Sequence, residues 1–395
     1  MKADLNLDQV LRLARVLKPA TAPAWHGAGH LLHLHVMGDR LTITAANLEL
    51  TAQVHLPGGL SDGNVAVVPQ ELIAALKAVA PTGRGRNRAR VSVHADLDRL
   101  HLDGPAASVT VDAQDSAPSD PSGLGDEELG IVQVPAGTWL AALRATLPAA
   151  GTNQTLPRLC TLHLHRDRGA CLLAEATDRY RIHRVRIGQP DPAPVDLHLP
   201  ADQTSIAAKI LTAAADPADP LQITATADRV TWRTATTMLA VSTIPDGLPD
   251  LEHFFERAAE ADLHFSIDAG AMAQACTRAD AVAERSQPVR LQVTPTSRTL
   301  TLTVTVDGAH GAPPRLALDL PIGDVRGPAA TLALNPTLAI ELFTAAGDGS
   351  AQVGVHTNRY APISVQAEGF HGLLIPVRTT DDRTTDNHQG EPAQG

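Results

Sequence analysis

The 395-residue sequence predicts an α+β protein built from three copies of one domain. Most of the chain alternates apolar and polar residues with a period of two, which is typical of half-buried antiparallel strands. Six short segments instead space their apolar residues as on one face of a helix. The order of helix, strand pair, loop, helix and strand pair occurs three times, and so long a period indicates repeated domains rather than a solenoid of small repeats.

The strand pattern is clearest over 31–57, 89–104 and 221–243. Each helical segment opens with Asp, Asn, Pro or a small residue before its apolar stripe, as helix starts do. The predicted helices span 7–18, 69–80, 136–147, 201–215, 268–285 and 335–347.

The predicted domain boundaries lie where turn-forming and charged residues gather, within 112–128 and 244–262. We therefore expect domains over 1–127, 128–255 and 256–378. The last segment, 379–395, has no apolar face and is predicted to be a disordered tail.

Composition narrows the class of protein. Aromatic residues make up only 3% of the chain, so the core must be aliphatic. Three cysteines, Cys160, Cys171 and Cys276, have no C-x-x-C spacing, which favours a reducing compartment and disfavours a structural zinc site. The N-terminus lacks the apolar core of a signal peptide and no run approaches 18 apolar residues, so we expect a cytoplasmic protein with no membrane contact.

The charge is unevenly distributed. A formal net charge of -11 argues against a simple basic coat for nucleic acid. The six helical windows with their adjoining loops nevertheless sum to +3, which leaves -14 for the remainder. If all six helices share one side of a curved sheet, that side could face a phosphate backbone. Ordinary solvated Arg and Lys side chains explain the same numbers equally well.

Two glycine-rich strings fail the tests for catalytic or nucleotide-binding motifs. GLSDG at 59–63 matches G-x-S-x-G, but it joins two strands, whereas a nucleophilic Ser61 would need a strand before it and a helix after it. GRGRNRAR at 83–90 follows a helix and lacks a terminal Lys-Ser/Thr, so it is no phosphate-binding P-loop. A solvated basic loop or a nucleic-acid contact remains for that segment.

Histidines raise the question of a metal. His33 and His35 share one strand face, as do His163 and His165, but the sequence places no third ligand beside either pair. Ordinary strand-face histidines are therefore the favoured interpretation. No acid–base pair or Cys–His pair has a catalytic spacing, so we expect no enzyme, no cofactor and no metal.

The string AEATDRYRIHRVRI (174–187) is the most informative. It resembles the A-T-D-(G/R)-(H/Y)-R-L signature in the middle domain of the bacterial sliding clamp, the beta subunit of DNA polymerase III. Four further segments resemble motifs of that family in the same order, although Asn47 replaces a usual Asp and Thr161 a usual Gly. They are LTITAANLELTAQV (41–54), LPRLCTLHL (156–164), IPDGLPDLEHFF (244–255) and LLIPVR (373–378).

The resemblance implies a head-to-tail homodimer of three-domain subunits that closes a ring around duplex DNA, with helices lining the hole and sheets outside. Such a protein is a processivity factor without a reaction of its own, and it contacts DNA through phosphates, independently of sequence. The DNA-binding candidates are Arg12, Arg15, Lys18, Lys77, Arg84, Arg86, Arg88, Arg144, Lys209 and Arg278. The expected dimer contact brings Val109 and Val111 of one subunit near Ala281 and Val282 of the next.

The resemblance also implies an apolar pocket for short linear peptides of the polymerase III alpha subunit, the clamp loader and repair polymerases. Aliphatic peptide side chains would bury against its wall, while Arg181 and Arg378 would meet polar or carboxylate groups at the rim. The expected pocket residues are Leu159, Thr177, Arg179, Tyr180, Arg181, Ile182, Pro249, Phe254, Leu373, Ile375, Pro376, Val377 and Arg378.

A second interpretation is a clamp-like paralogue, for example an inhibitor-tolerant second copy, that keeps the pocket but closes its ring differently. Phe254 and Ile375, which stand where other side chains are common in the family, would reshape the pocket. The acidic helices of the third repeat and the small Ala281 would weaken DNA contact and dimer contact.

Overall fold

The structure is a computed structural model, and it describes residues 1–23, 30–82, 88–96, 98–115, 129–167, 169–188, 195–245, 247–284, 287–304, 315–358 and 361–378. Its contacts divide the chain into two compact units. Unit 1 comprises 1–143, 162–172 and 187–247, and unit 2 comprises 144–161, 173–186 and 248–395. The division between the units falls inside the second predicted domain, 128–255. The boundaries near 127 and 255 therefore stay predictions.

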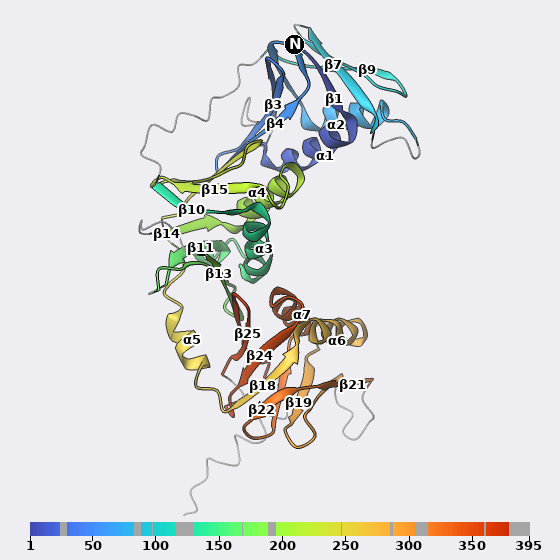
Figure 1. Ribbon diagram of the computed structural model, residues 1–395. Coiled ribbons are helices and arrows are strands. Elements are labelled where there is room, and N and C mark those ends of the chain that lie inside the picture. The colour runs from blue at the N-terminus through green and yellow to red at the C-terminus, as the bar shows by residue number, and fades with distance from the viewer. Residues whose placement is uncertain are drawn as a thin grey trace, which may run out of the picture. The chain divides into compact units, whose positions relative to one another are not determined.

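Unit 1 contains two antiparallel sheets (Figure 1). The first has the strand order β5 (Gly59–Ser61), β1 (Lys2–Asn6), β7 (Arg90–Asp96), β8 (Arg99–Asp103) and β9 (Ser108–Asp112). The second has the order β10 (Leu129–Pro135), β15 (Pro220–Ala225), β16 (Arg229–Arg233), β17 (Thr237–Ser242), β4 (Leu50–Pro57), β3 (Arg40–Ala46), β2 (Leu32–Met37) and β6 (Gly63–Val67). Two further strands of this unit, β11 (Thr161–Arg166) and β14 (Asp196–Pro200), are neighbours in a sheet.

Unit 2 contains two antiparallel sheet segments. One has the order β12 (Leu172–Thr177), β13 (Arg181–Gly188), β26 (Phe370–Leu374), β25 (Ile363–Ala367), β24 (Ser350–Val355), β18 (Leu263–Asp268) and β22 (Gly323–Arg326). The other has the order β21 (Leu316–Pro321), β20 (Thr299–Val304), β19 (Val289–Thr294) and β23 (Ala330–Leu334). The register Arg181↔Leu374 and Ile182↔Leu373 joins β13 to β26 and brings the 174–187 string beside the C-terminal motif.

All six predicted helices are present, and side-chain caps explain several of their starts. Asn6 accepts a hydrogen bond from the backbone N of Gln9 at 3.0 Å, and Asn335 caps the last of the six in the same way. They are α1 (Leu7–Leu17), α2 (Pro69–Ala78), α3 (Ala136–Thr146), α4 (Ala201–Ala214), α6 (Ala269–Val282) and α7 (Pro336–Ala345).

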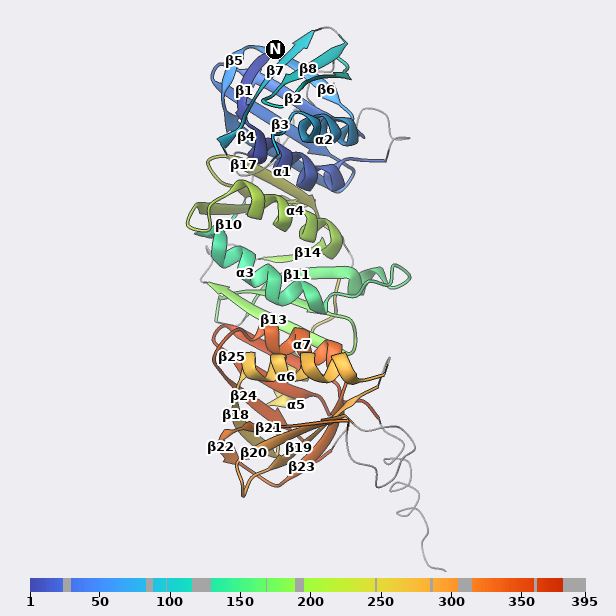
Figure 2. The ribbon, with the colours of Figure 1, turned by 90° about the vertical axis from the view of Figure 1, so that its right-hand side faces the viewer.

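The element order repeats as the sequence predicts. A strand runs directly into a helix at β1–α1, β10–α3 and β18–α6, and again at β6–α2, β14–α4 and β23–α7. In unit 1, α1 packs against both α2 and α4, and in unit 2 α6 packs against α7 (Figure 2). The α+β class is therefore confirmed.

The core is mostly aliphatic, as the composition predicts, and it includes a few aromatic side chains. Trp139 and Trp232 of unit 1 are fully buried and meet edge to face, with ring centroids 5.2 Å apart. Among the described residues, no helix is long and apolar enough to cross a membrane.

One helix was not predicted. Residues Glu252–Ala258 form α5, within the stretch that the sequence assigns to a linker. Two turns are too short for a helical period to be distinguished from a charged connection.

Candidate functional site

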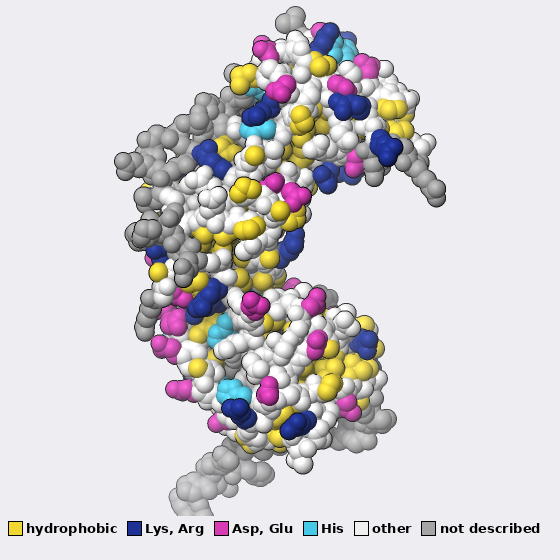
Figure 3. All heavy atoms as spheres, viewed as in Figure 1, with side chains coloured by type: hydrophobic (Ala, Val, Ile, Leu, Met, Phe, Trp, Pro, Cys, Tyr) yellow, Lys and Arg dark blue, Asp and Glu magenta, His cyan; other side chains and the backbone are white. Residues whose placement is uncertain are grey.

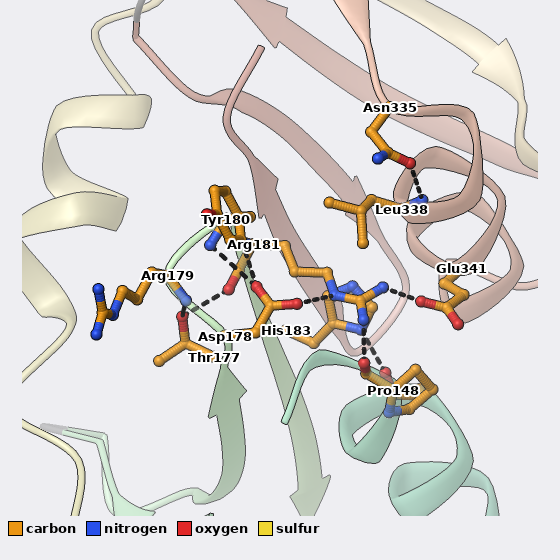
Figure 4. Close-up of polar contacts among 11 residues, drawn as sticks. Pro148, Thr177, Asp178, Arg179, Tyr180, Arg181, His183, Asn335, Leu338 and Glu341 are labelled. Atoms are coloured by element: carbon orange, nitrogen blue, oxygen red, sulfur yellow. Dashed lines mark hydrogen bonds and ion pairs between the residues drawn. The ribbon is translucent and has the colours of Figure 1, made fainter. Parts of the chain in front are cut away.

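The A-T-D-R-Y-R string forms a rigid hairpin tip in unit 2 (Figure 4). One carboxylate oxygen of Asp178 accepts hydrogen bonds from the backbone N of Tyr180 at 2.9 Å and of Arg181 at 3.1 Å. Thr177 Oγ1 donates to the Arg181 carbonyl at 2.6 Å and accepts from the Arg179 N at 3.1 Å. These bonds hold Arg179 at a φ of 79°, a left-handed conformation that a non-glycine residue seldom adopts. The tip is therefore fixed before any ligand arrives.

Arg181 supports the hairpin from inside. Its side chain is only 7% exposed, and Nε donates to Asp178 Oδ2 at 3.1 Å. Its two terminal nitrogens bond to the Glu341 carboxylate on α7 and to the Pro148 carbonyl. A buried guanidinium is stable only when its charge and donors are satisfied, and here the chain itself satisfies them. The expectation that Arg181 meets ligands at the rim is thus corrected to a supporting role.

A second buried cation, Arg184, joins β13 to α5. Its guanidinium bonds to the carboxylate of Glu175, lies 2.8 Å from that of Glu252, and stacks 3.7 Å from the ring centroid of Phe255. Sequence reasoning missed these residues. The ion pairs of Arg184 become visible only in the folded chain, because helix α5 was not predicted and the sequence separations of Glu175 and Glu252 from Arg184 do not by themselves indicate an ion pair.

Two neutral histidines lie beside these cations. His183 is fully buried, its Nδ1 donates to the Ala145 carbonyl at 2.6 Å, and burial lowers its pKa to about 4. Burial likewise lowers the pKa of His371 to about 4, with a further contribution from Arg184. At neutral pH both imidazoles are uncharged, which avoids repulsion with the nearby guanidinium groups.

Beneath the hairpin lies an apolar cluster of unit 2. Leu159 packs against it half-buried, whereas Ile182 and Leu373, two of the expected pocket residues, belong to its interior. The buried members are Ile182, Leu248, Leu251, Phe255, Ala258 and Leu373.

Three of the expected pocket residues have exposed side chains and are not among the buried members of this cluster. Tyr180 is 64% exposed, Ile375 43% and Phe254 39%. The Ile375 N donates to the Tyr180 carbonyl at 2.8 Å, so these two side chains belong to adjoining segments. Large apolar side chains gathered at one place on a surface mark a binding surface more often than single ones do.

The remaining expected residues do not all share this place. Arg179, Pro249 and Arg378 are exposed, and Thr177 is buried within the hairpin. Pro376 and Val377 line a cavity of about 250 Å³ together with residues of β23, β24 and β25. The Val377 N donates to the Ala333 carbonyl at 2.7 Å, which ties the C-terminal segment to β23.

The expected DNA-binding residues within the described part of the chain are all exposed, whereas Arg84 and Arg86 lie outside it. In unit 1, Arg12, Lys77 and Lys209 come from α1, α2 and α4, and α1 packs on the other two helices. Figure 3 shows basic and acidic side chains interspersed on the face in view. Arg278 is the one basic residue of α6 and α7, which also carry Asp280 and Glu341. The exposed set is Arg12, Arg15, Lys18, Lys77, Arg88, Arg144, Lys209 and Arg278.

The expected dimer residues lie on an edge strand of unit 1 and at the end of a helix of unit 2. β9, which carries Val109 and Val111 half-exposed, is an edge strand of unit 1. In unit 2, Ala281 and Val282 end helix α6, which contacts the edge strand β21. The sequence reasoning missed β21, whose Leu316, Leu318 and Leu320 are half-exposed. Unpaired edges with apolar side chains are suited to strand addition by another chain.

No family model matches the sequence, and no curated protein matches it. Solved structures do match. A DNA polymerase sliding clamp from Bacillus subtilis is 16% identical with a TM-score of 0.78, and the alignment covers 96% of this chain and 99% of that one. A putative DNA polymerase III beta subunit from Eubacterium rectale is 15% identical (TM-score 0.77), and one from Thermotoga maritima is 12% identical (0.78); for both the coverage is 96% and 100%. The chain therefore has the sliding-clamp fold over almost its full length.

Proposed function

We propose that this chain is a DNA sliding clamp of the polymerase III beta-subunit family, a cytoplasmic processivity factor that encircles duplex DNA. The observation that carries the proposal is the full-length match, since 96% of this chain aligns with the whole of several clamp structures. A protein that shared only one domain with clamps would not align in this way. The proposed role is topological tethering and includes no chemical step of its own.

DNA contact in this proposal is sequence-independent. The exposed basic side chains of α1, α2 and α4 would approach phosphates, and the adjacent acidic side chains would keep the contact loose enough for sliding. Arg12, Arg15 and Lys18 follow one another along α1 and its 3-10 extension, which makes this the most basic part of the helical surface. The helices of the third repeat would contribute less, because α6 and α7 carry one basic residue, Arg278, against the two acidic residues Asp280 and Glu341.

Peptide docking is proposed at the hairpin tip of unit 2. The rigid turn, the exposed Tyr180, Ile375 and Phe254, and the half-buried Leu159 supply apolar contact area on a preformed frame. Such a frame suits a short linear peptide with aliphatic or aromatic anchors, because little ordering entropy is lost on the protein side. The proposed partners are the polymerase III alpha subunit, the clamp loader and repair polymerases.

Ring closure is proposed to pair β9 of one subunit with β21 of the next, head to tail. Both are edge strands, and Val282 beside β21 is 40% exposed in the single chain. Two unlike edges on each chain are what a head-to-tail interface requires.

The decisive experiment measures molar mass by light scattering, peptide binding and retention on DNA with one preparation. We expect a dimer that binds a fluorescent peptide carrying a clamp-binding motif and that stays on nicked circular DNA until the circle is linearised. Tyr180→Ala should weaken the peptide at least about tenfold, because a large side chain loses its contact area. Leu48→Ala, an equally exposed apolar residue of unit 1, is the matched control and should bind normally.

If the chain binds the peptide but is a monomer, the interpretation as a clamp-like paralogue replaces the interpretation as a sliding clamp. A protein that neither dimerises nor binds would mean that the fold is shared and the function is not.

A further inference from the structure

A group of metal-ligating side chains lies in unit 1, and none of its members belongs to the proposed DNA, peptide or dimer surfaces. His163 and His165 stand two residues apart on β11, and Asp196 and His198 stand two residues apart on the neighbouring strand β14. Alternate residues of a strand share a face, so the two strands present all four side chains on one side. Leu162, Leu164 and Leu199, which alternate with these side chains along the two strands, are fully buried.

The sequence spacing indicates the pair His163 and His165 but does not indicate that Asp196 and His198 lie beside it. The residues from β14 are more than 30 positions away from His163, and only the pairing of the strands brings them together. The third ligand that spacing alone fails to place beside His163 is thus provided by the fold.

The distances suit a single ion. His163 Nε2 lies 2.8 Å from Asp196 Oδ1, and His198 Nε2 lies 3.9 Å from the same oxygen. Ligands about 2.0–2.1 Å from a tetrahedral Zn²⁺ are themselves separated by roughly 3.3 Å, so each observed separation needs to change by only about half an ångström. The ligand atoms of the three residues all lie within 4.8 Å of one another.

The surroundings hold these ligands in place. The ring of His163 stacks between His165 and His198, with centroids at 4.3 and 4.2 Å. The backbone at Gly247 presses on the His198 ring so closely that a Cβ there would lie 1.9 Å from its Cγ. A ligand whose orientation is fixed by packing binds a metal with less loss of entropy.

The burial also suits a site with one open position. The side chains of His163 and His198 are 11% and 13% exposed, while Asp196 is 80% exposed and leads to solvent.

We propose that His163, His198 and Asp196 bind one Zn²⁺ ion, with a fourth position open to water. Imidazole and carboxylate ligands in a tetrahedral arrangement are typical of zinc. The ion would clip β11 to β14, the strand that leads directly into helix α4. His165, stacked on His163, would orient it as a neighbour of the site.

The test titrates the full-length chain, first treated with chelator and dialysed, with ZnCl₂ by calorimetry. Co²⁺ serves as a second probe, because tetrahedral cobalt has intense visible absorption. We expect one Zn²⁺ per chain and a tetrahedral cobalt spectrum. His198→Gln and Asp196→Asn should each weaken binding about 100-fold or more, since even outer-shell changes cost 10–100-fold.

The chain offers a matched control. On the hairpin of β7 and β8, His94 and His101 lie 3.2 and 3.4 Å from the two oxygens of Asp96, but these side chains are 33–61% exposed. His101→Gln should leave zinc binding unchanged. If His198→Gln does not fold, Asp196→Asn still decides, because its exposed side chain contributes little packing.

Absence of zinc binding to the unaltered chain at micromolar concentrations would overturn the proposal. So would unchanged affinity in both site variants, or loss of the ion in His101→Gln alone.

Discussion

Acidification should destabilise unit 2 through His183, the buried imidazole behind the hairpin. Its pKa of about 4 in the folded chain is below the value of 6.5 that an unperturbed imidazole has. Between these two pH values the unfolded chain binds the proton and the folded chain does not, so the free energy of unfolding rises with pH. The contribution of the neutral His183 imidazole to the free energy of unfolding is fully present above pH 6.5 and is lost as the pH falls toward 4.

The two pKa values set the magnitude. At pH 7 the imidazole is mostly neutral in both states and has little effect. At pH 5 it is protonated in the unfolded chain and mostly neutral in the folded one, which lowers the free energy of unfolding by about 2 kcal/mol relative to pH 7.

The comparison of wild type with His183→Gln isolates this effect, because glutamine can still donate to the Ala145 carbonyl but does not titrate. Urea unfolding followed by far-ultraviolet circular dichroism at pH 7 and pH 5 gives the free energies. We expect the variant to gain about 2 kcal/mol on wild type as the pH falls from 7 to 5. His264→Gln, which replaces an exposed histidine that also bonds to a backbone carbonyl, is the control. The reasoning is refuted if wild type and His183→Gln lose stability equally on acidification.

Three further predictions concern the proposed clamp. Ile375→Asp should weaken a clamp-binding peptide at least about tenfold in fluorescence anisotropy, because a charge replaces apolar contact area; unchanged affinity would move the pocket elsewhere. Val282→Asp should shift the dimer toward monomer in sedimentation velocity, and an unaltered dimer would exclude this edge from the interface. Arg12→Glu with Arg15→Glu should reduce the dependence of DNA affinity on salt by a slope of about 2, and an unchanged slope would remove α1 from the DNA surface.

The fold was largely predictable because its signals are local. The period-two strands, the six helices and the threefold order follow from neighbouring residues, and the structure contains each of these helices within a few residues of its expected bounds. Helix α5 was not predicted, because seven residues are too few to show a helical period. Its acidic and basic residues are also typical of a linker.

The site was predictable only in part. Resemblance placed Tyr180, Phe254 and Ile375 together, and they are among the few large apolar side chains that the described chain exposes. It could not show that Arg181 is consumed by internal partners, because Glu341 lies 160 residues away and no spacing links them. Long-range pairing of charges is a property of the folded chain that one sequence does not display.

The buried pair Trp139 and Trp232 gives the protein an intrinsic fluorescence probe. Trp139 and Trp232 belong to unit 1, whereas the sequence of unit 2 contains no tryptophan. Tryptophan emission therefore reports the unfolding of unit 1 alone, while circular dichroism follows both units. Coincident transitions in the two signals would show that the units unfold as one cooperative body, and separated transitions would give each unit its own free energy of unfolding.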